Sequence, residues 1–174
     1  MNRSKITLML EISIAAAIAI VLSRLRIYKL PYGGSVSLEL FPIVYISFKR
    51  GISAGLFTGM LHAILSMIFI ENAIITFFQP VLDYFVPSMV IAICGFGYKK
   101  GLYVKEFLFF IAMILNFLSH FLSGFLYYGQ YASQGQSKYL YSAIYNISYT
   151  LPSAIAISII IYIFERKKIF EFSK

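Results

Sequence analysis

Charged residues are scarce in this chain of 174 residues. They make up 13% of it and hydrophobic residues make up 60%, with a mean hydropathy of +0.80, whereas soluble domains carry about 25% charged residues. This composition excludes an ordinary soluble domain. It predicts an all-α protein of the lipid bilayer, with a single membrane-embedded domain covering residues 1–174.

Cysteine and tryptophan are almost or entirely missing. The one cysteine, Cys94, lies within an apolar run, which excludes a disulfide framework and indicates a small packing residue. The chain has no tryptophan, so its 14 tyrosines and 17 phenylalanines must supply any aromatic stacking.

Motifs for catalysis and nucleotide binding are missing too. The sequence contains no Walker phosphate loop, hydrolase elbow or zinc spacing, so the chain cannot power transport by itself. His62 and His120 are too far apart to form a local metal motif, and their joint use with Asp83 in a metal site is an alternative of low weight.

Acidic residues are fewer than basic ones, 7 against 15, which gives a net charge of +8. Such a charge could indicate nucleic acid as a partner. The basic residues, however, form short clusters between apolar runs, as expected for the loops of a membrane protein. We therefore expect no nucleic-acid partner.

The apolar runs predict six transmembrane helices. Pro42 makes the second short or tilted, Glu71 and Asn72 are expected to end the third, and Pro80 and Pro87 should bend the fourth. The expected helices cover about 6–23, 38–48, 52–70, 75–97, 107–129 and 139–164.

The basic residues also predict the orientation of these helices. If both termini are cytoplasmic, eleven Lys and Arg residues fall on the inner side and four on the outer side. Loops one, three and five are then outside. The glycine-bearing first loop, Glu71, Tyr128 and Tyr141 are expected to gather at that outer face.

Small residues at four-residue spacing predict close contacts between helices. Ser13 with Ala17, and Ala15 with Ala19, have this spacing in the first helix. Gly51, Gly55 and Gly59 have it in the third. The spacing does not distinguish a neighbour in the same chain from a partner protein.

Polar and aromatic residues within apolar runs mark a candidate ligand site. His120, Gly124 and Tyr128 recur at i, i+4 and i+8, which aligns an imidazole, a gap and a phenol on one helix face. An interfacial aromatic belt with a hydrogen-bonded histidine is the simpler explanation of this stripe. Together with Asp83, a costly charge in a membrane segment, and with Asn146, the stripe suits a flat cationic heteroaromatic ligand.

Three separated segments in the same order resemble the thiamine-specific S-component of energy-coupling factor (ECF) transporters. They are PYGGSVSLELFPIVYISFKRGISAGLFTG (31–59), QPVLDYFVPSMVIAICGF (79–96) and HFLSGFLYYGQYASQGQSKYLYSAIYNISYTLPS (120–153). The resemblance implies six helices in a bacterial plasma membrane, a thiamine pocket near the outer face, and a lid formed by loop one. It also implies a transmembrane coupling subunit and two cytoplasmic ATPases as partners, with no cofactor and no catalysis in this chain.

The resemblance also implies roles for individual residues. Ser13 and Ala17 of the first helix would face the coupling subunit. The residues that match ligand contacts of the family are Asp83 and Tyr84 on the fourth helix, His120, Gly124 and Tyr128 on the fifth, and Tyr141 and Asn146 on the sixth.

This sequence departs from some relatives at aromatic positions. Tyr128 and His62 stand where relatives carry tryptophan, and Gly33 or Gly34 stands where loop one would supply another. Asn116 replaces a lysine four residues before the histidine. These changes bear on affinity, and they keep open a second hypothesis, an S-component for another vitamin or for a thiamine precursor. A membrane enzyme that uses His120 and Asp83 is a third hypothesis, from a different class.

Overall fold

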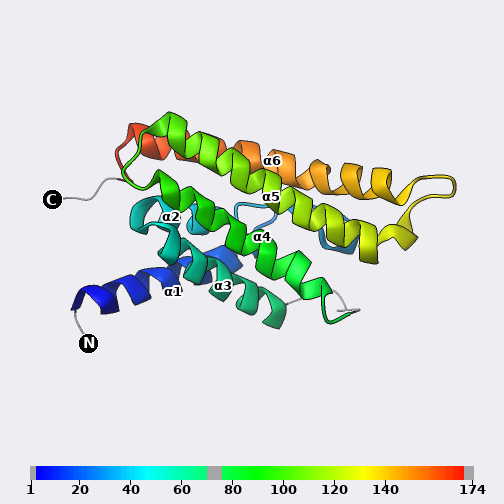
Figure 1. Cartoon of the computed structure of the whole chain (residues 1–174), viewed down its shortest axis with the longest axis horizontal. Helices are drawn as coiled ribbons and strands as arrows, with labels where there is room; N and C mark the ends of the chain where they lie inside the picture. The colour runs from blue at the N-terminus through cyan, green and yellow to red at the C-terminus, as the bar shows by residue number, and fades with distance from the viewer. Residues whose placement is uncertain (1–2, 70–75, 171–174) are drawn as a thin grey trace.

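The structure, a computed structural model, describes residues 3–69 and 76–170 and consists mainly of helices (Figure 1). Glu71 and Asn72, expected at the end of the third helix, lie outside these residues. The prediction of six helices is confirmed within the described ranges. Five of them are α1 (Arg3–Arg24), α2 (Phe41–Arg50), α3 (Ile52–Ile68), α5 (Leu102–Tyr127) and α6 (Lys138–Arg166).

The fourth helix is continuous but irregular. It runs through a π-helix, η2 (Val81–Phe85), a short α-helix, α4 (Val86–Met89), and a 3₁₀-helix, η3 (Val90–Gly97). Pro87 offers no N–H to the carbonyl group of Asp83, and its ring presses on that turn. The helix widens there, so that the Val86 N–H bonds to the Val81 carbonyl. The prolines thus account for the irregular turn, which carries Asp83.

The first loop is more ordered than its glycines suggest. Two short antiparallel strands, β1 (Tyr28–Lys29) and β2 (Ser35–Val36), pair Tyr28 with Val36 and enclose the 3₁₀ turn η1 (Pro31–Gly33). Strand β2 lies against α6. The loop is therefore a small hairpin held on the helix bundle. A second 3₁₀ turn, η4 (Gly129–Tyr131), follows α5.

The helices pack in two layers around the fourth one. Helices α5 and α6 lie side by side along their lengths (Figure 1). The η3 segment contacts α2, α3 and α5, whereas α1 packs against α2 and α3 at the edge of the bundle. Helices α1, α5 and α6 are long and apolar enough to cross a membrane. Helix α2, with 10 residues, is about 15 Å long and cannot span one alone.

Close approach at the small residues occurs as predicted within the bundle. A Cβ atom on Gly55 would lie 3.0 Å from the Ala92 Cα, and one on Gly59 would lie 2.5 Å from the Ser88 carbonyl oxygen. Gly51 instead makes the turn between α2 and α3, with φ of 87°. These contacts bring α3 against the fourth helix.

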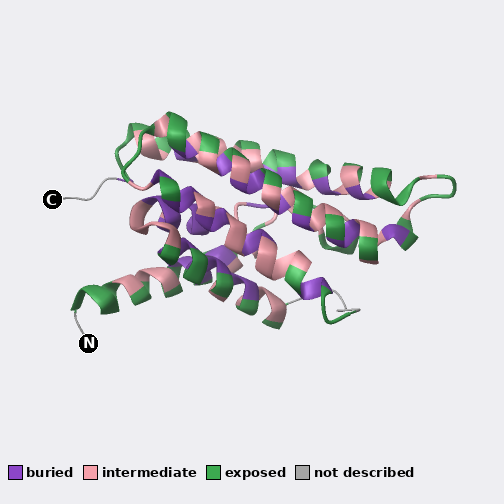
Figure 2. Ribbon diagram, in the orientation of Figure 1, coloured by how far each residue is buried: buried purple, intermediate pink, exposed green. Residues whose placement is uncertain are grey.

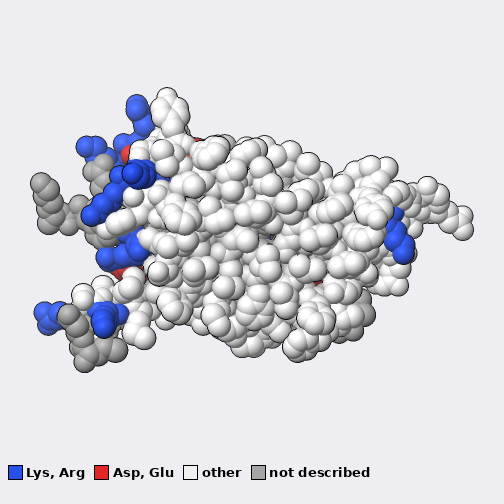
Figure 3. Space-filling model, in the orientation of Figure 1, with Lys and Arg blue, Asp and Glu red and all other residues white. Residues whose placement is uncertain are grey.

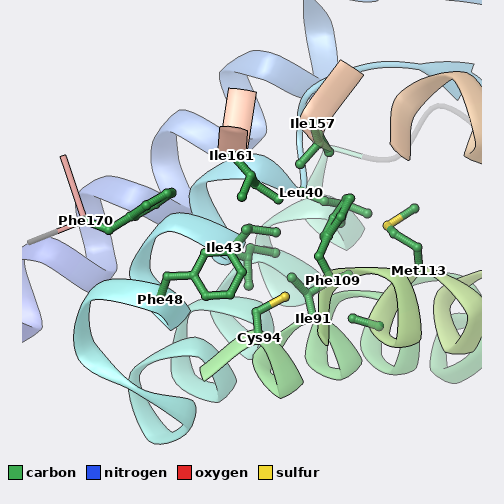
Figure 4. Close-up of a cluster of buried hydrophobic side chains, with 12 residues drawn as sticks. Leu40, Ile43, Phe48, Ile91, Cys94, Phe109, Met113, Ile157, Ile161 and Phe170 are labelled. Carbon is green, nitrogen blue, oxygen red and sulfur yellow. The ribbon is translucent and has the colours of Figure 1, made fainter. Parts of the chain in front are cut away.

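The two ends of the molecule differ in composition. Buried residues lie mostly along the inner faces of the helices (Figure 2). Lys and Arg gather at the end where α1 begins and α6 ends (Figure 3). An apolar cluster lies toward this basic end. Figure 4 shows its side chains, which include Ile43, Phe48, Ile91, Phe109 and Ile161. We call the opposite end, which contains loop one and the start of α6, the cavity end.

Candidate functional site

A cavity of about 210 Å³ opens among loop one, α3, the π-helical turn, α5 and α6. It is far larger than the roughly 10–15 Å³ that a cavity needs, on this measure, to hold one water molecule. Leu40 and Met113 belong both to its wall and to the apolar cluster, so that cluster closes one side of it. All ten predicted ligand residues line this cavity: Gly33, Gly34, His62, Asp83, Tyr84, His120, Gly124, Tyr128, Tyr141 and Asn146.

Asp83 lies on the π-helical turn and faces the end of α5. The Tyr128 hydroxyl donates to Asp83 Oδ2 at 3.3 Å and accepts from the Gln79 side-chain amide at 2.6 Å. The carboxylate therefore lies beside a phenol that is itself hydrogen-bonded. Tyr84, the next residue, is half-buried in the same wall.

His120 and Asn146 connect α5 to α6. The Asn146 amide donates to the His120 carbonyl oxygen at 3.2 Å and to the Ser142 carbonyl oxygen at 2.8 Å. Its oxygen accepts from the Tyr149 hydroxyl at 2.6 Å, and the ring of Tyr149 meets the His120 imidazole edge to face, with centroids 5.9 Å apart. We expected Asn146 to donate to and accept from a ligand. In the structure its side chain bonds to neighbouring protein groups.

Gly124 allows α6 to approach α5 at this point. A Cβ atom there would lie 2.3 Å from the Ser142 hydroxyl oxygen and 2.9 Å from the Asn146 amide nitrogen. The gap that the sequence places between His120 and Tyr128 is thus filled by side chains of α6.

Loop one covers the cavity and is held by tyrosines. The Tyr145 hydroxyl accepts from the Gly34 N–H at 2.9 Å and donates to the Pro31 carbonyl oxygen. Tyr32 stacks on Tyr131, with ring centroids 4.0 Å apart and planes 18° from parallel. Both contacts attach the loop to the segment that begins with η4 and continues into α6.

His62 lies at the side of the cavity formed by α3. Its Nδ1 is 2.9 Å from the Ser88 hydroxyl and its Nε2 is 3.3 Å from the Ser66 hydroxyl. Both ring nitrogens therefore have hydrogen-bond partners. Within residues 3–69 and 76–170, no three His, Cys, Asp or Glu side chains come close enough to hold a metal ion together.

Sequence reasoning missed several residues of the cavity wall. Glu39 lies just before the short helix α2. No helical spacing in the sequence connected it to the other site residues. Tyr32 supplies the aromatic ring of loop one, one position before the glycines named for that role. The further residues are Arg24, Arg26, Tyr145 and Tyr149. The spacing of Tyr141, Tyr145 and Tyr149 at i, i+4 and i+8 was a usable signal, because it places three phenols on one helix face.

The chemistry of the wall favours a flat cation. Asp83 and Glu39 provide carboxylates, and six tyrosines provide aromatic faces and hydroxyl groups. Arg24 and Arg26 offset the charge of Glu39. Aromatic faces attract cations and stack on heterocycles, and carboxylates bind positive rings or amines.

The two small stripes of α1 serve different surfaces. Ala15 and Ala19 are buried against the bundle, whereas Ser13 and Ala17 are exposed. The exposed stripe therefore remains accessible on the outside of this chain, which partner binding would require.

Comparison with known proteins decides the family. The sequence profile of the thiamine transporter protein family (Thia_YuaJ) matches residues 9–172. The chain belongs to this family. It is 32% identical to the thiamine transporter ThiT of Bacillus subtilis (strain 168) over 92% of each chain. The family predicted from the three sequence segments is confirmed, and with it a multi-pass membrane protein.

Solved structures agree with this family. ThiT from Listeria monocytogenes superimposes with a TM-score of 0.86 at 27% identity, over 97% of this chain and 99% of that one. The S component of a bacterial ECF transporter superimposes with a TM-score of 0.67 at 18% identity, over 95% and 96% of the two chains. The second likeness is one of fold, and the predicted S-component-like helix bundle is confirmed.

Proposed function

We propose that this chain is the thiamine-binding S-component of an ECF importer in a bacterial cell membrane. It captures thiamine and catalyses no reaction itself. Family membership supports the transport role. The observation that supports thiamine as the ligand is a cavity in which Asp83 and His120 lie among six tyrosines, because thiamine carries a positive thiazolium ring and an aminopyrimidine.

The cavity end faces the outside of the cell in this proposal. Its support is the cluster of Lys and Arg at the opposite end (Figure 3), which suits the cytoplasmic side of a membrane. Loop one then acts as the lid, and thiamine enters when the contacts of Tyr145 with Gly34 and Pro31 open.

The ten predicted residues are the ligand site in this proposal. The tyrosines stack on the two rings, and Asp83 accepts from the amine or neutralises the cation. The Asn146 amide holds α5 and α6 at the right separation through its bond to the His120 carbonyl oxygen, and the His120 imidazole, in the cavity wall, contributes a hydrogen bond to the ligand. Gly33 and Gly34 allow loop one to close, and His62 completes the wall at α3.

Calorimetric titration of the detergent-purified chain with thiamine tests the ligand. The chain has no tryptophan, so heat is a better signal than fluorescence. We expect saturable one-to-one binding of thiamine, no binding of riboflavin, and at least a 100-fold loss of affinity in Asp83→Asn/His120→Ala, because hydrogen bonds to charged groups contribute about 1.5–3 kcal/mol each. Intact thiamine binding in that variant would overturn the site. Binding of only riboflavin or the isolated pyrimidine would overturn the ligand.

The partners are a transmembrane coupling subunit and two ATPases, and the exposed stripe of α1 docks the coupling subunit. Ala17→Trp places a bulky ring on that stripe, so uptake into cells should fall to background while the purified chain still binds thiamine. Leu122→Trp is the matched control, because Leu122 is exposed on α5. Normal uptake by Ala17→Trp would reject this docking surface.

A further inference from the structure

Gln79 takes no part in the cavity wall, yet it is connected to the wall by a chain of hydrogen bonds. Its amide Nε2 donates to the Tyr128 hydroxyl at 2.6 Å, and that hydroxyl donates to Asp83 Oδ2 at 3.3 Å. Gln79 is 1% exposed and is among the largest fully buried side chains. A buried amide in this position is expensive to keep unless its hydrogen bonds are made.

The chain of hydrogen bonds has a fixed direction. An amide N–H can only donate, and an ionised carboxylate can only accept. Tyr128 has one hydroxyl proton, and its oxygen already accepts from Gln79. The proton is therefore directed at Asp83. Hydrogen bonds in such a chain polarise one another, which strengthens the bond that reaches the carboxylate.

The helices fix the positions of all three groups. Gln79 and Asp83 are four residues apart across the start of the π-helical turn, so they lie on neighbouring parts of one helix face. Tyr128 follows α5, and its N–H bonds to the Gly124 carbonyl oxygen. The phenol thus connects two helices immediately beside the cavity.

We propose that Gln79 is a positioning residue for ligand binding. Through Tyr128 it fixes the orientation of the Asp83 carboxylate and the plane of the Tyr128 ring, so that Oδ2 is held by the protein and Oδ1 is directed to the positive ring or amine of the ligand. This inference rests on the proposed thiamine site. It also gives a physical role to Tyr128. Its hydroxyl accepts from the Gln79 amide and donates to the Asp83 carboxylate, which a purely hydrocarbon ring could not do.

Substitutions that keep the size of Gln79 test the proposal. Gln79→Met removes the donor, and Gln79→Glu keeps the shape but replaces the donor by an acceptor that competes with Asp83 for the Tyr128 proton. We expect thiamine affinity to fall roughly tenfold in Gln79→Met, as for the loss of one hydrogen bond between neutral groups, and at least as much in Gln79→Glu. A residue that only filled space would tolerate Gln79→Met, which is apolar and of similar size.

A double-mutant cycle with Tyr128→Phe separates positioning from packing. Once the hydroxyl is gone, Gln79→Met should change thiamine affinity less than about twofold, as coupling through that hydroxyl requires. The exposed residues Gln134 and Tyr139 provide the matched controls, as Gln134→Met, Gln134→Glu and Tyr139→Phe. Additive losses in the cycle, or wild-type affinity in Gln79→Met, would overturn the proposal.

The same variants separate this proposal from the assignment of thiamine. If the wild-type chain binds thiamine and the cycle is additive, the thiamine site stands and the role of Gln79 is rejected. If the wild-type chain releases no heat with thiamine, the ligand is wrong, and the cycle is read from the melting temperature of the ligand-free protein. Non-additive melting temperatures would then support the orienting chain of hydrogen bonds, and additive ones would reject it.

Discussion

The cavity end and the basic end of this protein use their interior in opposite ways. At the cavity end, buried polar side chains such as Ser142, Asn146 and Gln79 form hydrogen bonds around an open space. At the basic end, aromatic and aliphatic side chains fill the interior, and Lys105 with Glu165 forms the ion pair buried among them. We infer that the basic end contributes most of the stability, whereas the cavity end is packed less tightly, which leaves room for a ligand.

The largest effect on stability is expected from breaking the ion pair of the basic end. Lys105 is 3% exposed, its Nζ lies 2.5 Å from Glu165 Oε2, and it also lies over the Phe170 ring. Lys105→Met leaves Glu165 without this partner. We expect a loss of roughly 2–3 kcal/mol, below the about 3–5 kcal/mol typical of fully buried pairs because Glu165 is partly exposed.

Thermal unfolding in detergent measures this loss, and titration with thiamine should show unchanged affinity. Lys100→Met is the matched control, because Lys100 is exposed and lies at the same end of the molecule. Adding Glu165→Met to Lys105→Met should restore part of the stability, since the unpaired carboxylate is then removed. A large loss of thiamine affinity in Lys105→Met would mean that the two ends are not independent.

An intermediate effect is expected at the contact between α5 and α6 in the cavity wall. Gly124→Ala places a methyl group against Ser142 and Asn146, and overpacking of this kind costs about 1–3 kcal/mol. Thiamine affinity should fall with stability, because the wall itself must move. Gly101→Ala is the control, since a Cβ atom there meets nothing within 4 Å. Unchanged affinity in Gly124→Ala would show that α6 can shift without disturbing the site.

The smallest effect is expected at the lid. Tyr145→Phe keeps the ring but removes the hydroxyl group that bonds to Gly34 and Pro31. Each such hydrogen bond contributes a net 0.5–1.5 kcal/mol or so, and the two bonds fall in the lower part of this range because they are exposed or half-buried. We therefore expect thiamine to dissociate roughly 5- to 30-fold faster. Release of radiolabelled thiamine measures the rate, with Tyr162→Phe, at an exposed position on α6, as the control. An unchanged rate would mean that loop one does not limit release.

Much of this architecture could be predicted because membrane helices leave strong signals in a sequence. Long apolar runs predicted α1, α5 and α6, and glycine spacing predicted the close contact at Gly55 and Gly59. The positions chosen for the ligand site lie around one cavity in the structure, although their role in binding stays a prediction. An isolated charge such as Asp83 within an apolar run is a strong signal, because the membrane makes it costly.

What could not be predicted depends on contacts between distant segments. The π-helical turn at Asp83 reflects the effect of Pro87 on the turn before it. The prolines in the sequence predicted that the helix bends, but not that it widens into a π-helix. The hairpin of loop one is held by Tyr145, more than a hundred residues away. The partner of Gln79 likewise follows only from the packing of α5 against the fourth helix. Helix bounds shifted for a related reason, since α2 begins at Phe41, after the turn that contains Glu39.

The close contact of Gly34 with α6 bears on whether loop one lies on the cavity or is displaced from it. A Cβ atom on Gly34 would lie 2.7 Å from one carbon of the Tyr149 ring and 2.9 Å from the Tyr145 hydroxyl oxygen. The backbone there has φ of −58°, which any residue adopts. A methyl group at this position would push loop one away from α6 without straining the backbone. Gly34→Ala is therefore expected to favour a form of the protein in which loop one is displaced from the cavity.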